Sequence, residues 1–497
     1  MKLTIKNLGA LKEAEIDLSK DLILLCGHNN TGKTYVAYAI YEFLRDEIKP
    51  FFEEHNNLFI ETKHIIETLN ESIEIDLIGI YESNRKLFTD EINDSKKGVE
   101  SKEKYFKNIE YKITLPSIKK FRSVFLTAKV DLKMWIGNHT ILTARKDKDK
   151  SLVNFDLSNL KYDHKKQSKN FTKEEIVNNS TVRAIIYMMI LGKIGIRDEK
   201  RIKIFTSERA AINIFSKELA LNKNQFFDKI LKTKGEDRTK LLNFAEENIN
   251  RYQKPIADEL LIAEDLLNLS KQKSDFEFLA IELEKSILEG KISVGQYGGL
   301  QYQPNFYKNE KNENKQEENV VLEIYQTSSL VKSLASLVFY LRHSAKKNDC
   351  IIIDEPELNL HPDNQVLVAR FLARLVNEGF KVVASTHSDY IIRELNNLLM
   401  LNNSFGEKEE LMQKYEYNKN ELLTNQQVGA YYFQKGKNTA VPVPLLKRGI
   451  EIDSINDVIT DLNERSDDIY YTFLESDENI AAEKEEEKIA QENLKSK

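Results

Sequence analysis

The chain has 497 residues, a length typical of about three domains. Its net charge is −6, from 79 acidic and 73 basic residues. Hydrophobic residues make up 41% and charged residues 31%, which indicates a globular protein without a global basic field for nucleic acid. No apolar run approaches the roughly 20 residues of a transmembrane helix, and the N-terminus lacks the apolar core of a signal peptide. We therefore expect a cytoplasmic protein with no membrane association.

The first 45 residues carry a phosphate-loop pattern. Residues 3–18 alternate apolar and polar side chains around a turn at Asn7–Gly9, which predicts a hairpin. A short apolar strand follows at Leu22–Cys26, and Tyr35–Arg45 has the pattern of a helix. Between them, Gly27–Thr34 reads Gly-His-Asn-Asn-Thr-Gly-Lys-Thr, a complete G-x-x-x-x-G-K-T loop. The strand–loop–helix context indicates a phosphate site, because backbone N–H groups and a helix N-terminus face the anion.

We expect this loop to bind ATP together with Mg²⁺. Lys33 is predicted to reach the β- and γ-phosphates, and the hydroxyl of Thr34 is a predicted metal ligand. The alternative is a glycine turn without a ligand. The residues of the loop that we predict to bind the nucleotide are Gly27, Asn29, Asn30, Thr31, Gly32, Lys33 and Thr34.

A second stretch, Ile351–Glu355, predicts a buried strand that ends in two carboxylates. Open α/β sheets bind ligands at the carboxyl ends of their strands. Asp354 is therefore a predicted metal ligand, since Mg²⁺ takes few protein carboxylates and keeps several waters. Glu355 is the predicted catalytic residue that polarises the water attacking a phosphoryl group. The alternative is a structural strand that ends in acidic turn residues before Pro356.

Two further polar segments lie on either side of this strand. Ser328 and Ser329 open an amphipathic helix that runs to Arg342, and they are either an ordinary N-cap or a second helix start that faces phosphate. His387 follows the next predicted strand, which begins at Lys381. A lone His at a strand end is more often structural, but this one is also placed to sense a γ-phosphate, so we assign it a catalytic role.

The rest of the chain predicts a mixed, mainly helical organisation. Residues 51 to about 105 and 217–289 have helical patterns, 105–142 alternates as strands do, and 146–169 has the composition of a loop. The fold class is therefore α/β, with an ATPase domain split by a large, mainly helical insertion. The predicted segments are an N-terminal ATPase part at 1–49, an insertion at 50–199, a return strand at 200–216, a helical insertion at 217–290, a C-terminal ATPase part at 291–435, and an extension with a charged tail at 436–497.

These motifs together resemble the ABC-type ATPases of the SMC and OLD kind. Gly27–Thr34 matches their Walker A loop, Ile351–Glu355 their Walker B strand and Thr386–Ser388 their switch histidine. The sequence around Asp354 and His387 is similar to that of prokaryotic defence ATPases of the AriA type from PARIS anti-phage systems. The signature turn of the family usually carries Ser followed by Gly, whereas Leu330 follows Ser329 here. No Q-loop glutamine is identified; the segment around Glu208 and Arg209 is the candidate for that neighbourhood.

The resemblance implies an ATP-hydrolysing switch or scaffold that controls a separate effector protein, encoded nearby, in anti-phage defence. It also implies a homodimer or higher homo-oligomer, in which Ser328 and Ser329 complete a partner's nucleotide site. The alternative is an SMC- or OLD-like ATPase that binds DNA directly and acts in DNA processing or repair. The large insertion provides binding surface in either case, unless it is a passive decoration.

Overall fold

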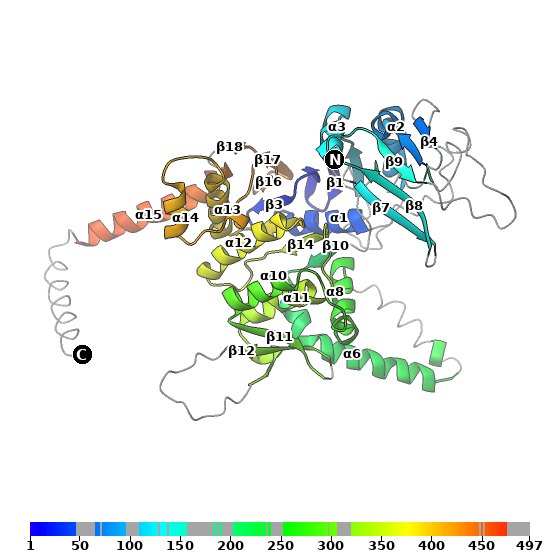
Figure 1. The fold of residues 1–497 in the computed structure, drawn as a ribbon. Coiled ribbons are helices and arrows are strands. Elements are labelled where there is room, and N and C mark those ends of the chain that lie inside the picture. Colours follow the sequence, from blue (N-terminus) through cyan, green and yellow to red (C-terminus); the bar gives the residue numbers. More distant parts are fainter. Residues whose placement is uncertain are drawn as a thin grey trace, which may run out of the picture. The chain divides into compact units, whose positions relative to one another are not determined.

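The computed structural model divides the chain into two compact units, Met1–Gly449 and Ile450–Lys497. Figure 1 shows the elements of both units, coloured along the sequence from blue at the N-terminus to red at the C-terminus. The residues that the structure describes are 1–45, 65–69, 72–95, 109–127, 130–136, 139–156, 182–183, 186, 189–190, 202–234, 237–239, 252–296, 298–305, 320–446, 449–450 and 453–474.

Within the described residues of the first unit, nine strands form one mixed sheet in the order β10-β14-β15-β3-β16-β17-β2-β1-β6. The five strands from β10 to β16 are parallel to one another, whereas β17, β2, β1 and β6 form the mixed, partly antiparallel end. The bounds are β1 (Lys2–Leu8), β2 (Leu11–Asp17), β3 (Leu22–Gly27), β6 (Glu110–Thr114), β10 (Ile202–Phe205), β14 (Cys350–Asp354), β15 (Lys381–Thr386), β16 (Val428–Phe433) and β17 (Thr439–Val443).

The register of the parallel strands brings their carboxyl ends to the same level. All six residues of β3 are buried, as expected for a central parallel strand covered on both faces. Asp354 at the end of β14 pairs with Ser385 of β15, and Thr386 of β15 pairs with Cys26 of β3. The residues that follow these three strands therefore meet at one edge of the sheet.

Helices cover both faces of this parallel half. Helix α1 (Lys33–Arg45) packs on β3, β10, β14 and β15 and shares one apolar cluster with alternate strand residues such as Ile23 and Ile352. The buried residues at the intervening positions, such as Leu24, point to the other face because successive strand side chains alternate. That face carries α12 (Pro362–Asn377), which packs on β15 and on α13 (Asp389–Leu401).

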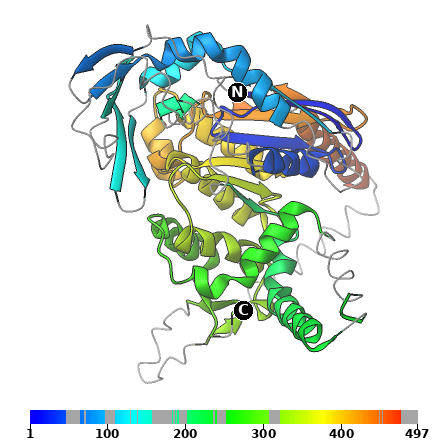
Figure 2. The same ribbon diagram turned by 90° about the vertical axis from the view of Figure 1, so that its right-hand side faces the viewer.

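Several helices and a small antiparallel sheet gather below the large sheet in both ribbon views (Figures 1 and 2). Within them α11 packs on α6 and α10, and α6 packs on α8. The bounds are α6 (Arg209–Lys232), α8 (Lys254–Glu264), α9 (Leu266–Leu269), α10 (Glu277–Leu283), a π-helical turn η5 (Glu284–Leu288), β11 (Gly290–Val294), β12 (Leu300–Pro304), β13 (Leu322–Glu323), a 3-10 turn η6 (Ile324–Gln326) and α11 (Ser329–His343).

A five-stranded antiparallel sheet and two helices come from the described part of residues 65–156, and here three sequence predictions are wrong. Residues 65–69 and 72–75 form a strand pair instead of helix, Ile118–Thr127 is a helix instead of strand, and residues 153–156 form a strand inside the predicted loop. Ser117 caps the helix, and Phe121 and Phe125 are buried at helical spacing. The elements are β4 (Ile65–Leu69), β5 (Ser72–Ile75), α2 (Leu77–Ser95), α3 (Ile118–Thr127), β7 (Val130–Ile136), β8 (His139–Lys146) and β9 (Val153–Asp156).

The predicted α/β fold is confirmed, as are the N-terminal hairpin and the strands that carry the motifs. The division into segments 1–49, 50–199, 200–216, 217–290, 291–435 and 436–497 remains a prediction. Among the described helices, none combines the length and apolar character needed to cross a membrane. The part of the predicted extension and charged tail that follows residue 474 lies outside the described residues. The remaining elements are α14 (Lys408–Lys414), a 3-10 turn η7 (Lys419–Glu421), β18 (Leu445–Leu446), β19 (Gly449–Ile450) and, in the second unit, α15 (Asp453–Leu474).

Candidate nucleotide-binding site

The predicted phosphate loop connects the end of β3 to the start of α1. Its backbone is specialised: Gly27 has φ +136°, Asn30 +60° and Gly32 +97°. A Cβ on Gly27 would lie 2.3 Å from the carbonyl oxygen of Phe433, so only glycine fits beside β16. Asn29 and Asn30 are exposed, whereas Thr31 is half-buried and its hydroxyl donates a hydrogen bond to the carbonyl of His28 at 2.7 Å. The loop is thus open to solvent at its tip and held at its base.

Lys33 lies buried in the centre of the loop, with 6% of its surface exposed. Its ammonium group donates hydrogen bonds to the carbonyl oxygens of Gly27 at 2.9 Å and His28 at 2.7 Å. Burial lowers the pKa of Lys33, while the carboxylates of Glu355 and Glu357 act to raise it. A cation held at the centre of the loop attracts a phosphate group that enters it, and the nearby carboxylates oppose this attraction.

Asp354 joins the phosphate loop to the end of β14. The hydroxyl of Thr34 donates a hydrogen bond to Asp354 Oδ1 at 3.1 Å, and the hydroxyl of Ser385 donates to the same oxygen. The second carboxylate oxygen, Oδ2, is buried and has no hydrogen-bond partner among the described residues. Burial raises the pKa of Asp354, and the two hydroxyl donors act in the opposite direction. One hydroxyl and one carboxylate with a spare oxygen are a donor set that suits Mg²⁺, which keeps most of its water shell.

Glu355 and His387 face each other across the ends of β14 and β15. His387 Nδ1 lies 3.8 Å from Glu355 Oε1 and 3.4 Å from Glu357 Oε1. The backbone of Glu355 is left-handed, with φ +48°, which is uncommon for a residue with a side chain. Such strain clusters at functional sites, where the surrounding structure holds it in place. The structure thus brings both predicted catalytic residues next to the predicted metal ligands.

A family comparison agrees with this geometry, because the model of the AAA ATPase domain family matches residues 1–392. The chain belongs to the AAA ATPase domain family. No match is found among curated proteins. Two solved structures of SMC head domains are similar at low identity.

The first of these is an SMC head bound to the C-winged helix domain of ScpA. It is 12% identical, with a TM-score of 0.32, over 89% of this chain and 96% of that chain. The second is an SMC head domain with an extended coiled coil, bound to the C-terminal domain of ScpA and derived from Pyrococcus furiosus. It is 14% identical, with a TM-score of 0.31, over 93% of this chain and 98% of that one.

Ser328 and Ser329 stand apart from the other predicted site residues of this AAA ATPase. Ser328 is the N-cap of α11, and its hydroxyl accepts a hydrogen bond from the backbone N–H of Val331 at 3.3 Å. Both serines are exposed. Within the described residues, neither forms a hydrogen bond with the phosphate loop or with β14. The N-cap interpretation is thus confirmed, and the role toward a partner's nucleotide remains a prediction.

Glu357 organises the site but was not predicted to belong to it. Its Oε1 accepts hydrogen bonds from the hydroxyl of Thr386 at 2.8 Å and from the backbone N–H of His387 at 2.9 Å. The residue is 5% exposed, and within the described part of the chain its Oε2 has no hydrogen-bond partner. Glu357 therefore fixes the turn that carries His387. The only signal in the sequence was its place two residues after Glu355.

The segment around Glu208 and Arg209 does lie at the site. The hydroxyl of Tyr38 on α1 donates a hydrogen bond to Glu208 Oε2 at 3.2 Å. Burial raises the pKa of Tyr38, and the charge of Glu208 adds to this shift. Arg209 is buried and reaches the backbone of both Asp354 and Glu355. The segment therefore lies beside α1 and the end of β14, and its assignment to the Q-loop neighbourhood stays a prediction.

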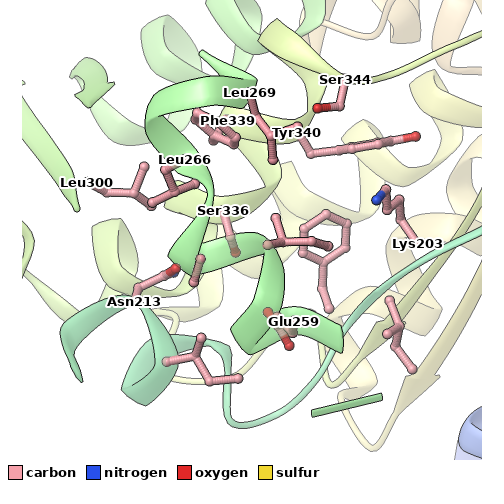
Figure 3. A pocket seen from close by; sticks show the side chains of 15 residues that line it. Lys203, Asn213, Glu259, Leu266, Leu269, Leu300, Ser336, Phe339, Tyr340 and Ser344 are labelled. Atoms are coloured by element: carbon pink, nitrogen blue, oxygen red, sulfur yellow. The ribbon is translucent and has the colours of Figure 1, made fainter. Parts of the chain in front are cut away.

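A small cavity of about 40 Å³ lies behind this segment, between α8, β10 and α11. Figure 3 shows Phe339 and Tyr340 on one side of the cavity and Glu259 on another. Glu259 Oε2 accepts hydrogen bonds from the backbone N–H and the hydroxyl of Thr206, at 2.9 and 2.7 Å. Glu259 Oε1 and the hydroxyl of Ser336, which also lines the cavity, are buried and have no hydrogen-bond partners in the part of the chain that the structure describes. Burial raises the pKa of Glu259 to about 7, although Thr206 and Arg209 oppose the shift.

Among the side chains that the structure describes, no group of three or more His, Cys, Asp and Glu residues is arranged to hold a metal ion. The predicted Mg²⁺ site has two protein ligands, Thr34 and Asp354, so it is not a site of three or more such side chains; Mg²⁺ keeps several waters as its other ligands.

Proposed function

We propose that this AAA ATPase binds and hydrolyses ATP and acts as a switch or scaffold that controls a separate effector protein in anti-phage defence. The observation that carries the nucleotide part of the proposal is the hydrogen bond from Thr34 to Asp354, which joins two motifs 320 residues apart in the sequence. Around this bond, one edge of the sheet gathers a buried lysine, a carboxylate with a spare oxygen, and a strained glutamate beside a histidine.

Each of these side chains has a distinct role in the proposed reaction. Lys33 and the N-terminus of α1 bind the phosphates. Thr34 and Asp354 hold Mg²⁺, which when bound neutralises charge on the phosphate oxygens. Glu355 orients and polarises the attacking water, and its fixed backbone keeps the carboxylate in place. His387 lies beside Glu355, with 3.8 Å between its Nδ1 and Glu355 Oε1, and is the residue that senses the γ-phosphate.

Nucleotide binding and hydrolysis are separable by two substitutions. Lys33→Ala is expected to abolish ATP binding, because it removes the cation from the centre of the loop. Glu355→Gln is expected to bind ATP and hydrolyse it very slowly. Lys20→Ala is the matched control, because Lys20 also donates to two backbone carbonyls, those of Asn425 and Gln426, but outside the loop. Full turnover by Glu355→Gln, or equal effects of Lys33→Ala and Lys20→Ala on binding, would contradict these assignments.

The switch requires a change of state on ATP binding, and pairing of two ATPase domains would provide it. The exposed Ser328 and Ser329 at the start of α11 are available for contact with a second protomer's nucleotide. A closed pair is favoured by ATP only if it makes contacts that the open state lacks. Ser329→Arg is expected to leave ATP binding by each protomer intact and to reduce hydrolysis. The oligomeric state is measured by light scattering with ATP present. A strict monomer that keeps full ATPase activity would refute the pairing.

Control of an effector rests on the resemblance to defence ATPases and on the size of the segments outside the nucleotide site. The test is co-purification of the chain from its native host with the product of the neighbouring gene, with and without ATP. Phage challenge of cells that carry Lys33→Ala then measures whether the ATP site is needed for protection. Retention on DNA that weakens steeply with salt would instead favour the DNA-processing alternative.

A further inference from the structure

Arg209 is an unusual buried arginine because all four of its side-chain hydrogen bonds go to backbone carbonyl oxygens. Nε donates to Ser333 at 3.0 Å, and Nη1 donates to Thr206 at 2.9 Å and to Asp354 at 2.6 Å. Nη2 donates to Glu355 at 2.7 Å. Only 1% of the residue is exposed. A buried arginine is usually paired with a carboxylate, whereas this one connects the backbones of β10, β14 and α11.

Two of these carbonyls belong to the point where β14 ends. The backbone of Glu355 is held at both its N–H and its carbonyl. The N–H donates to the backbone carbonyl of Ser385 at 3.0 Å and lies 3.2 Å from the hydroxyl of the same residue. The carbonyl accepts hydrogen bonds from Arg209 at 2.7 Å and from the backbone N–H of Leu358 at 3.0 Å. The left-handed backbone of Glu355 needs such restraint, because a residue with a side chain returns to a relaxed conformation when its neighbours allow it. The direction of the Glu355 carboxylate follows from that backbone.

A second layer of hydrogen bonds holds the residues whose carbonyls the guanidinium contacts. The backbone N–H of Arg209 donates to the carbonyl of Thr206 at 3.2 Å, and Thr206 is fixed in turn by its two hydrogen bonds to Glu259. On the opposite side, the hydroxyl of Ser333 donates to the carbonyl of Leu358 at 3.2 Å, in the turn after β14. The planar fork therefore has little freedom to choose other acceptors.

We propose that Arg209 is the positioning residue of the reaction: it sets the backbone of Glu355 and ties that backbone to the first turns of α11. It acts through Glu355 and does not contact the nucleotide. Ser333 lies four residues, about one turn, after Ser329, so a displacement of the start of α11 reaches Glu355 through a single side chain. This inference rests on the proposed hydrolysis, but its structural part is independent of turnover.

The experiment compares Arg209→Lys with Arg342→Lys. Arg342 is the matched control because it is also buried, at 8% exposure, and binds a backbone carbonyl, that of Ile292, together with Glu284, away from the nucleotide site. Lysine keeps the charge but cannot reproduce the fork. Arg209→Lys is expected to lower kcat by about tenfold to a hundredfold, as for a misplaced catalytic group, with KM for ATP within about twofold of wild type. Arg342→Lys is expected to lower the melting temperature while leaving kcat per folded protein unchanged.

A crystal structure of each variant gives the second readout, which does not depend on activity. In Arg209→Lys the peptide of Glu355 is expected to leave the left-handed region, whereas in Arg342→Lys it stays. If wild-type protein does not turn over ATP, the proposed function fails, and these structures still decide whether Arg209 holds Glu355. Arg209→Gln, which brings no charge into the core, is the second variant and is expected to give the same result.

Three outcomes overturn the proposal. The first is a wild-type kcat in folded Arg209→Lys or Arg209→Gln. The second is an unchanged Glu355 backbone in both variants. The third is failure of both variants to fold when Arg342→Lys folds, since Arg209 would then be a folding residue without a specific role in placing Glu355.

Discussion

The buried carboxyl of Glu259 makes the stability of this protein depend on pH in a way that one substitution removes. Glu259 is 5% exposed, and its Oε1, beside the cavity, has no hydrogen-bond partner among the residues that the structure describes. Burial raises its pKa from 4.5 to about 7 in the folded chain. Glu259→Gln keeps the shape of the protonated acid, and its amide oxygen can still accept the two hydrogen bonds from Thr206. The variant therefore retains the packing and loses the titration.

The direction and the magnitude follow from proton linkage. Between pH 4.5 and 7 the folded chain keeps a proton on Glu259 that the unfolded chain releases, so the free energy of unfolding falls as pH rises through this window. Above pH 7 both states are ionised, and the loss is complete. With these two pKa values, the loss between pH 5 and pH 8 is about 2.5 kcal/mol, from a slope of about 1.4 kcal/mol per pH unit.

The assay is urea unfolding of wild type and Glu259→Gln at pH 5, 6, 7 and 8, followed by circular dichroism. The difference between the two proteins removes the titration of all groups that they share. We expect Glu259→Gln to gain about 2.5 kcal/mol relative to wild type from pH 5 to pH 8. Ser336→Ala is the control, because it removes the other unpartnered polar atom at the cavity without removing a titrating group, and its effect should not vary with pH. Parallel curves for wild type and Glu259→Gln would refute the reasoning.

Three further substitutions test contacts elsewhere in the first unit. Gly27→Ala is expected to abolish ATP binding and lower the melting temperature, because the new Cβ would lie 2.3 Å from the Phe433 carbonyl oxygen; unchanged ATP affinity by calorimetry would contradict this. Asp354→Asn should lower ATP affinity about tenfold in Mg²⁺ but little in EDTA, and an equal loss in both buffers would argue against a metal ligand. Arg370→Ala removes the 2.6 Å ion pair with Glu394 and leaves that carboxylate buried. We expect the free energy of unfolding in urea to fall by about 3 kcal/mol, with unchanged ATP affinity.

The parts of the site that could be predicted are those in which chemistry and local structure occupy consecutive residues. The loop from Gly27 to Thr34 and the pair Asp354–Glu355 each follow an apolar strand, so type, position and chemistry are all visible in a short window. The parallel arrangement then brings the two together, since strand ends of a parallel sheet share one edge. This is why a hydrogen bond between residues 34 and 354 was foreseeable in kind.

The contacts that support the site could not be predicted, because their partners are set by tertiary structure. Glu357 binds the turn at His387, and Arg209 binds backbone atoms, which leave no trace in a sequence pattern. The errors between residues 51 and 156 have the same origin. Apolar periodicity over short segments does not separate strand from helix, and Ser117 with Phe121 gave a helix signal that the general alternation concealed.

The position of α11 explains how one helix can serve two purposes in this fold. Its first residue, Ser329, is exposed, whereas Ser333, one turn later, is buried and hydrogen-bonded to both Arg209 and the turn after β14. A contact made at the exposed end can therefore be transmitted to the buried end and on to the end of β14, because packed elements move as rigid bodies between discrete positions. Such coupling between sites is typically worth about 1–3 kcal/mol, enough to change the rate at Glu355 by one or two orders of magnitude. Arg209 joins Ser333 of α11 to the backbone of Glu355 and so gives a direct route from a contact at Ser329 to the proposed reaction.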